Sequence, residues 1–176
     1  MKFQKKSLGQ NFLVDKNIVR KIVNLTDFKN KNVIEIGPGK GALTEEILKK
    51  NPKSLILLEK DNELSKYLNS KYLSNKLVKI INADVLKFNF NKIKRKNSIL
   101  IGNLPYNISS QILVQIIKTS EVEKKFSNLI LMFQKELGEK IIAKFPSKNY
   151  GRLSIMVNYK LNFIRKFLVS ANCFFP

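Results

Sequence analysis

The chain of 176 residues contains no histidine, no tryptophan and a single cysteine, Cys173. A disulfide within the chain is therefore impossible, and a metal site of the histidine and cysteine type cannot form. Any catalysis must proceed without a histidine base. No apolar run reaches the length that crosses a membrane, and no signal-peptide segment follows the basic start. We therefore expect a soluble, cytoplasmic protein that needs no metal and has no membrane partner.

Acidic residues are also scarce. Aspartate and glutamate number 13 against 33 lysines and arginines, which gives a net charge of +20. An AT-rich genome would account for many lysines but does not obviously account for so few acids. Because a compact domain with this charge is attracted to polyanions, we expect a nucleic-acid partner. The length and the 44% content of hydrophobic residues suit one folded domain.

Short apolar runs alternate with amphipathic helical patterns along most of the chain. Strands are predicted at residues 32–36, 54–58, 77–81, 98–102 and 129–133, with a closing pair at 153–159 and 163–169. Helices are predicted after Asp15, from about Gly41, after Asp61, and over residues 108–118 and 135–144. This alternation predicts an α/β domain with a mainly parallel sheet.

Chemically distinctive residues follow four of the predicted strands: Gly37, Glu59, Asp84 and Asn103. The carboxyl ends of parallel strands meet at one edge of a sheet, and ligands of such folds bind beyond that edge. The sequence therefore predicts one site that contains all four residues.

The first of these residues opens a glycine-rich run that reads Glu-Ile-Gly-Pro-Gly-Lys-Gly-Ala from Glu35 to Ala42. Gly37 and Gly39 allow a tight turn and a close approach of the backbone to a ligand. Glu59 lies 20 residues beyond Gly39, where an acid would bind ribose hydroxyls. This spacing fits NAD and S-adenosylmethionine equally well, and a glycine turn without a ligand is the plainer alternative.

Asp84 and the adjacent Val85 follow the third strand. A carboxylate in this position can accept a hydrogen bond from the amine of an adenine ring, although an aspartate there is also a common helix cap or turn residue.

The run Asn103-Leu104-Pro105-Tyr106 favours methyl transfer over hydride transfer. The exocyclic nitrogen of adenine is a poor nucleophile, and acceptors that hold its N–H groups favour a tetrahedral nitrogen. The Asn103 side chain and the Leu104 carbonyl can supply two such acceptors, because Pro105 restricts Leu104 to an extended conformation. Tyr106 can stack on a flipped base. The alternative is an ordinary loop with Tyr106 in the core.

Two further segments carry basic, amide or aromatic groups. The arm from Lys5 to Leu13 includes Gln10 and Asn11, which could cap a cofactor pocket. Phe174 and Phe175 stand near the end of the chain, where packing is the default interpretation.

Taken together, these motifs resemble the ribosomal RNA adenine dimethyltransferase family. The resemblance covers the chain from the Gly-Gln-Asn-Phe-Leu arm to Phe174. The segments Phe133–Glu136 and Tyr150–Ser154 resemble the branch that acts on small-subunit RNA, whereas the sister branch that modifies large-subunit RNA typically lacks both.

The resemblance implies a seven-stranded, Rossmann-like methyltransferase fold with helices on both faces, and S-adenosylmethionine as cofactor. It implies dimethylation of adenine N6 in 16S ribosomal RNA, with the small-subunit precursor as partner and a monomeric enzyme. It assigns the cofactor to Gln10, Asn11, Leu13, Gly37, Gly39, Glu59, Asp84, Val85 and Asn103. It assigns the target adenine to Asn103, Leu104, Tyr106 and Phe174.

The family continues beyond the phenylalanine into a Pro-x-Pro segment and a small helical domain. We therefore interpret residues 1–176 as the catalytic domain alone, without that helical domain. Three other functions stay open: a nicotinamide-dependent dehydrogenase, a non-catalytic, RNA-binding ribosome assembly factor of the same fold, and a large-subunit ribosomal RNA adenine methyltransferase.

Overall fold

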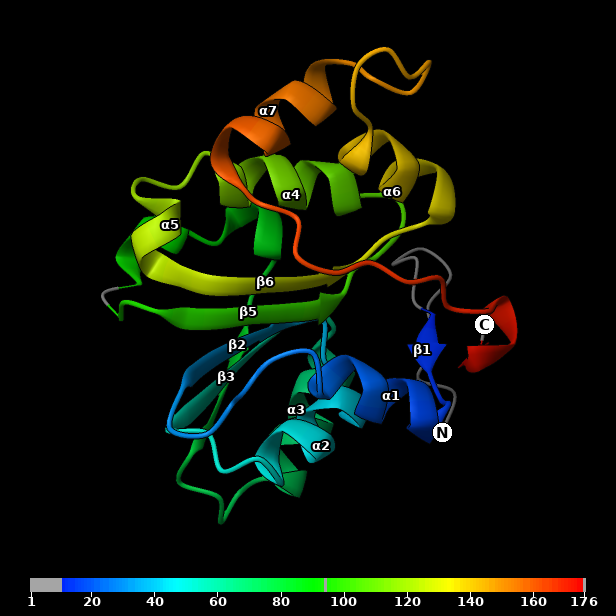
Figure 1. Cartoon of the computed structure of the whole chain (residues 1–176). Helices are drawn as coiled ribbons and strands as arrows, with labels where there is room; N and C mark the ends of the chain where they lie inside the picture. The colour runs from blue at the N-terminus through cyan, green and yellow to red at the C-terminus, as the bar shows by residue number, and fades with distance from the viewer. Residues whose placement is uncertain (1–10, 94, 176) are drawn as a thin grey trace.

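The computed structural model describes residues 11–93 and 95–175. Its centre is a sheet of five parallel strands in the order β4-β3-β2-β5-β6. The central strand is β2 (Asn32–Ile36), with β3 (Ser54–Glu59) and β4 (Val78–Asn82) on one side. On the other side lie β5 (Ser98–Asn103) and β6 (Phe126–Met132), as Figure 1 shows. Because the strand order reverses between β2 and β5, a crevice is expected where these two strands end.

Both faces of the sheet are buried, which explains why the strands are apolar at nearly every position. Side chains alternate between two cores: Val33 and Ile99 belong to one, and Ile34 and Leu100 belong to the other. A pattern of this kind is typical of a sheet that has helices on both sides.

The helices divide between the two faces (Figure 1). The first face packs against α1 (Lys16–Val23), α2 (Ala42–Leu48) and α3 (Asn62–Lys71). The second packs against α4 (Ser109–Ile117) and α5 (Val122–Lys125), together with the short 3-10 turns η2 (Val85–Lys87) and η3 (Phe90–Lys92). Beyond β6, α6 (Lys135–Ile142) and α7 (Arg152–Lys160) pack on α4 as a small helical pair. Asp15 and Asp61 cap α1 and α3, as predicted.

A separate antiparallel ribbon joins two segments from opposite ends of the sequence. Strand β1 (Phe12–Leu13) pairs with β7 (Phe174–Phe175), which follows the 3-10 turn η4 (Ala171–Cys173). The Cys173 carbonyl accepts hydrogen bonds from the Val14 and Asp15 amides at 2.9 and 3.3 Å. This ribbon lies beside the carboxyl edge of the sheet and was not predicted.

The prediction of a closing strand pair is wrong. Residues 153–159 form most of α7, and residues 163–169 form neither helix nor strand. The buried positions of α7 are Ser154 and Val157, three residues apart, which is a helical spacing. The Ser154 hydroxyl also accepts a hydrogen bond from the Gly151 amide and donates one to the Lys140 carbonyl, and so fixes the start of the helix. The Rossmann-like α/β fold is confirmed, with five strands in one parallel sheet and two in the ribbon.

Among the described residues, no helix is both long enough and apolar enough to cross a membrane.

Candidate active site

A cavity of about 470 Å³ opens at the carboxyl edge of the sheet, where the neighbouring strands β2 and β5 end. This volume is in the range of small-molecule and cofactor sites. Nine residues predicted to form the site lie on its wall: Asn11, Leu13, Gly37, Gly39, Glu59, Asp84, Val85, Asn103 and Leu104. The sheet therefore brings together the four strand ends, as the sequence predicts.

The glycine loop between β2 and α2 forms the floor of the cavity. Gly37 and Gly39 adopt φ angles of +64° and +57°, which residues other than glycine rarely adopt. A Cβ atom at Gly39 would lie only 2.8 Å from the Phe12 ring. The Gly37 amide donates to the Leu58 carbonyl at 2.9 Å, and this hydrogen bond ties the loop to β3. The loop is therefore both conformationally special and closely packed.

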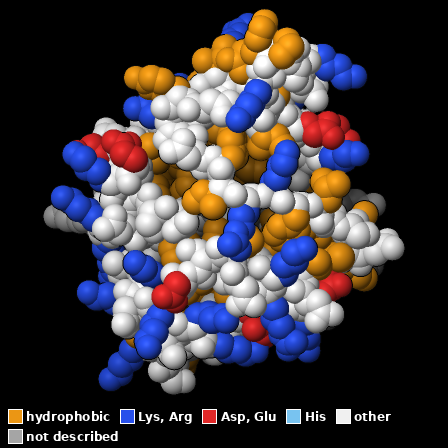
Figure 2. Space-filling model, in the orientation of Figure 1, with side chains coloured by type: hydrophobic (Ala, Val, Ile, Leu, Met, Phe, Trp, Pro, Cys, Tyr) orange, Lys and Arg blue, Asp and Glu red, His pale blue; other side chains and the backbone are white. Residues whose placement is uncertain are grey.

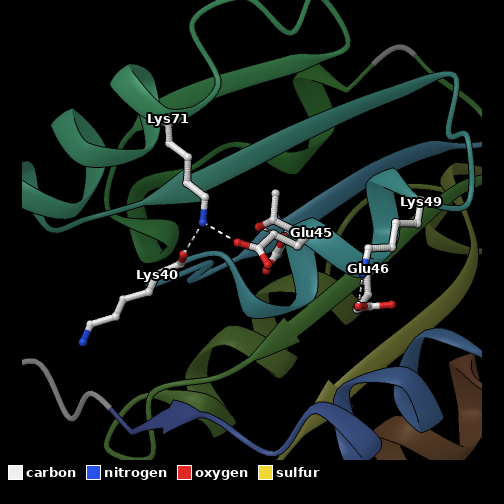
Figure 3. A network of polar contacts seen from close by, with 7 residues as sticks. Lys40, Glu45, Glu46, Lys49 and Lys71 are labelled. Carbon is white, nitrogen blue, oxygen red and sulfur yellow. Dashed lines mark hydrogen bonds and ion pairs between the residues drawn. The ribbon is translucent and has the colours of Figure 1, made fainter.

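The outer side of the glycine loop is held by a lysine from α3. The Lys71 ammonium donates to the Lys40 carbonyl at 3.2 Å and forms an ion pair with Glu45 of α2 (Figure 3). A second ion pair, Lys49 with Glu46, lies further along α2. The Lys71 contacts join α2, α3 and the loop, so the cavity floor is supported from outside.

Glu59, at the end of β3, is only 6% exposed. Its carboxylate accepts the Gly39 amide at 3.2 Å with one oxygen and the Asp61 amide at 2.9 Å with the other. Burial raises the pKa of Glu59, while these backbone donors oppose the shift. A carboxylate has about four acceptor sites, so acceptor capacity remains for a ligand hydroxyl.

Asp84 follows β4 and has the cap role that the sequence offers for it, while its role toward an adenine amine stays a prediction. One oxygen accepts the Leu86 amide at 3.0 Å, as a cap of η2. The other forms an ion pair with Lys60 at 2.9 Å. The Lys60 ammonium holds the pKa of Asp84 below its usual value, so this carboxyl is an acceptor at neutral pH.

Asn103 ends β5 and has a distinctive hydrogen-bonding state. Its Nδ2 donates to the Asn11 carbonyl at 2.7 Å. Its Oδ1 is buried and has no hydrogen-bond partner among the described residues. A buried amide oxygen without a partner is costly. Asn103 also lies on the cavity wall, so its unpartnered oxygen is a candidate acceptor for an N–H donor from a ligand.

Three other residues of the predicted adenine site have different surroundings. Leu104 is buried on the cavity wall, together with Pro105. Tyr106 and Phe174 do not line the cavity, and Phe174 packs partly against the core beneath α1. Phe175, its neighbour in β7, lines the cavity instead and is 58% exposed. The stacking roles of Tyr106 and Phe174 stay predictions, and Gln10 lies outside the described residues.

A buried carboxyl that the sequence did not single out lies behind the glycine loop. Glu35 of β2 is 1% exposed and accepts a hydrogen bond from the Thr44 hydroxyl of α2 at 2.7 Å. Burial raises the pKa of Glu35 to about 8, against the opposing effect of the Thr44 hydroxyl. Glu35 is therefore protonated near neutral pH.

Sequence reasoning missed several residues of the cavity wall, among them Lys60, Asn107 and Phe175. Lys60 could have been found, because it directly follows Glu59 at a strand end. Phe175 could not, because the ribbon brings it to the cavity through pairing with a distant segment. No group of three or more potential metal ligands from histidine, cysteine, aspartate and glutamate occurs within residues 11–93 and 95–175.

The sheet order, the glycine loop and the acid at the end of β3 define a Rossmann-like methyltransferase fold. Solved structures support this class. A dimethyladenosine transferase from Plasmodium falciparum is 29% identical, with a TM-score of 0.72 over 84% of this chain and 52% of that one. The 23S ribosomal RNA methyltransferase ErmE is 25% identical, with a TM-score of 0.65 over 84% of this chain and 55% of its own.

The family model of ribosomal RNA adenine dimethylases matches residues 1–176, and the chain belongs to this family. The ribosomal RNA small subunit methyltransferase A of Pelagibacter ubique is 49% identical over 164 residues, which are 93% of this chain. The chain spans 62% of the length of that relative.

Proposed function

We propose that the protein transfers methyl groups from S-adenosylmethionine to the N6 amine of adenines in small-subunit ribosomal RNA. The observation that carries this proposal is the state of Asn103 on the wall of a cavity of cofactor size. Its Oδ1 is buried and has no hydrogen-bond partner within residues 11–93 and 95–175. Membership of the adenine dimethylase family supports the reaction. The name of the relative from Pelagibacter ubique supports the small-subunit substrate.

The residues of the cavity fit S-adenosylmethionine. Glu59 has acceptor capacity left for a ribose hydroxyl, and the ionised Asp84 can accept a hydrogen bond from an adenine amine. The absence of a side chain at Gly39 lets the glycine loop pack closely against Phe12 on the cavity wall. Asn11 and Leu13 close the cavity from the ribbon side. When bound, S-adenosylmethionine supplies a methyl group that is already activated on a sulfonium.

The role of the chain is to position the target amine and to accept its hydrogen bonds. The hydrogen bond from Asn103 Nδ2 to the Asn11 carbonyl orients the amide so that Oδ1 is the acceptor. The Leu104 carbonyl is the second acceptor, held in direction by Pro105. With both N–H groups held, the nitrogen lone pair is less delocalised into the ring and points along the transfer direction. Positioning of this kind requires neither a histidine base nor a protein nucleophile.

Domain organisation follows the same proposal: residues 1–176 form the methyltransferase domain that binds the cofactor and the target adenine. The protein acts as a soluble monomer on the ribosomal subunit precursor in the cytoplasm.

The test is transfer of tritiated methyl from S-adenosylmethionine to unmethylated small subunits, followed by mapping of the modified bases. We expect dimethylated adenines in 16S RNA. Label in large-subunit RNA alone would assign the chain to the other branch. Subunit binding without any label, for the wild type as for Asn103→Ala, would favour the assembly-factor function. Binding of NAD in place of S-adenosylhomocysteine would favour a dehydrogenase.

A further inference from the structure

The distribution of charge along the chain is uneven near its C-terminal end. The last acidic residue is Glu139, so residues 140–176 contain no aspartate or glutamate. The same stretch contains seven cations: Lys140, Lys144, Lys148, Arg152, Lys160, Arg165 and Lys166. Elsewhere, lysines such as Lys49, Lys71 and Lys124 form ion pairs with glutamates. A stretch that has cations and no acids is suited to a polyanion.

Part of this stretch is exposed on α7 and on the loop that precedes it. We call it the α7 surface and define it by Phe145, Lys148, Tyr150, Arg152, Tyr159 and Lys160. The inner side of α7 packs on α4 and α6 through Val157. Its outer side is left to solvent, and Figure 2 shows hydrophobic side chains over α7 and the preceding loop at the top of the molecule, with blue side chains beside them.

Two of the three aromatic residues of the α7 surface are largely open to solvent. Phe145 is 80% exposed and Tyr159 is 82% exposed. The Phe145 and Tyr150 rings meet edge to face at 6.3 Å, and the Lys160 ammonium lies 5.3 Å from the centre of the Tyr159 ring. Proteins bind single-stranded nucleic acids with exposed aromatic rings next to cations, because bases stack on the rings and phosphates pair with the cations.

The α7 surface also lies on the substrate side of the fold. The residues proposed for the ribose and the adenine of the cofactor, Glu59 and Asp84, lie at the ends of β3 and β4. By contrast, α6 directly follows β6, which pairs with β5 at Asn103 and Met132. After α7 the chain returns to the cavity, where Phe175 forms part of the wall. A nucleic acid on α7 would therefore approach from the side of Asn103 and not from the side of Asp84.

We propose that the α7 surface binds unpaired nucleotides that flank the target adenine, with Phe145 and Tyr159 as stacking platforms. This inference rests on the proposed function, because it extends the RNA substrate of the same site. The absence of acids favours RNA over a protein partner, whose surface would normally present charges of both signs.

The experiment measures binding of a fluorescent, unstructured oligoadenylate to the 176-residue chain by anisotropy, over a series of salt concentrations and without cofactor. Stacking contributes about 1–3 kcal/mol per base. We therefore expect Phe145→Ala and Tyr159→Ala each to weaken binding by about fivefold or more, with the salt dependence unchanged. Lys148→Gln should instead lower the slope of log K against log salt by about 0.7, the value for one phosphate contact on a single strand.

Matched controls lie on the opposite part of the molecule, after α3. Leu73 is 86% exposed, and Lys76 is exposed nearby. Leu73→Ala should leave the affinity unchanged. Lys76→Gln should lower the affinity only slightly, through the loss of one positive charge from the net charge of the protein. A duplex RNA of equal length should bind the wild type and Tyr159→Ala equally, because its bases are not available for stacking.

Several outcomes would overturn the proposal. One is equal oligoadenylate affinity for the wild type, Phe145→Ala and Tyr159→Ala, with all three folded. Another is that Phe145→Ala or Tyr159→Ala sediments differently from the wild type but binds RNA equally well. This result would make the α7 surface a contact between copies of the chain. Failure of the proposed function is separate, since it would appear as absent methyl transfer and absent S-adenosylhomocysteine binding while the oligoadenylate results stand.

Discussion

Replacement of Glu59 by glutamine tests the cofactor site at its most buried acid. The change keeps the size of the side chain but leaves one acceptor oxygen where the carboxylate has two. In the wild type, both oxygens accept backbone amides, from Gly39 and Asp61. The new NH₂ group would face one of these amides, so a buried donor would lose its partner.

The size of the effect follows from these hydrogen bonds. A buried donor left without a partner costs about 1–3 kcal/mol, so the melting temperature of Glu59→Gln should fall by several degrees. Hydrogen bonds from a ligand to a charged group contribute about 1.5–3 kcal/mol. Loss of the ribose contacts should therefore weaken binding of S-adenosylhomocysteine by roughly tenfold to 150-fold.

Calorimetric titration with S-adenosylhomocysteine, at a temperature where both proteins are folded, measures this loss. Glu123→Gln is the matched control, because Glu123 is an exposed glutamate of α5, away from the cavity. It should bind as the wild type does. Wild-type affinity in a folded Glu59→Gln would refute the ribose assignment and leave Glu59 as a brace of the glycine loop only.

Three further substitutions test other parts of the site. Asn103→Ala should reduce single-turnover methylation on the order of 10²-fold or more while S-adenosylhomocysteine affinity changes little, and near-normal turnover would disprove its role as acceptor. Glu35 has a pKa of about 8 in the folded protein against 4.5 ordinarily, so the fold retains a proton that the unfolded chain releases. The Glu35 carboxyl should accordingly make the free energy of unfolding decrease as the pH rises from about 4.5 to 8, by up to about 1.4 kcal/mol per pH unit. The free energy of unfolding of Glu35→Gln, measured with urea, should not show this decrease. Identical pH dependence of the free energy in Glu35→Gln and the wild type would contradict the raised pKa. Gly39→Ala should lower the free energy of unfolding by about 1–2 kcal/mol, because of the positive φ at this position and the contact with Phe12, and should also weaken cofactor binding. Adding Phe12→Ala should restore the part of this loss that is due to the contact with the ring. If the effects of the two changes on the free energy of unfolding simply add, the contact does not matter.

The central sheet could be predicted from sequence because each strand is an uninterrupted apolar run with a marked end. The same regularity placed Gly37, Glu59, Asp84 and Asn103 at one edge, where the cavity lies. Runs of this kind are buried on both faces, so local composition alone identifies them.

Features that depend on contacts between distant segments could not be predicted in this way. The helix α7 contains β-branched residues that resemble a strand, and its helical form depends on packing against α4 and α6. The ribbon has only two residues in each strand, too few for a periodic pattern. The ion pair between Lys60 and Asp84 joins the ends of two strands and needs the sheet register to be known.

The β1–β7 ribbon has a consequence for the order in which the molecule forms and opens. Its partners are separated by most of the sequence, as the contact of Asp15 with Cys173 illustrates at 158 residues. Closing so long a loop costs entropy that few hydrogen bonds offset, so the ribbon should assemble after the sheet and separate before it. The amides of Val14 and Asp15 should consequently exchange with solvent through a local opening, at a lower free energy than the amides of β2 and β5. Such an opening would withdraw Asn11, Leu13 and Phe175 from the cavity wall while the rest of the domain stays folded, giving large ligands a route in and out.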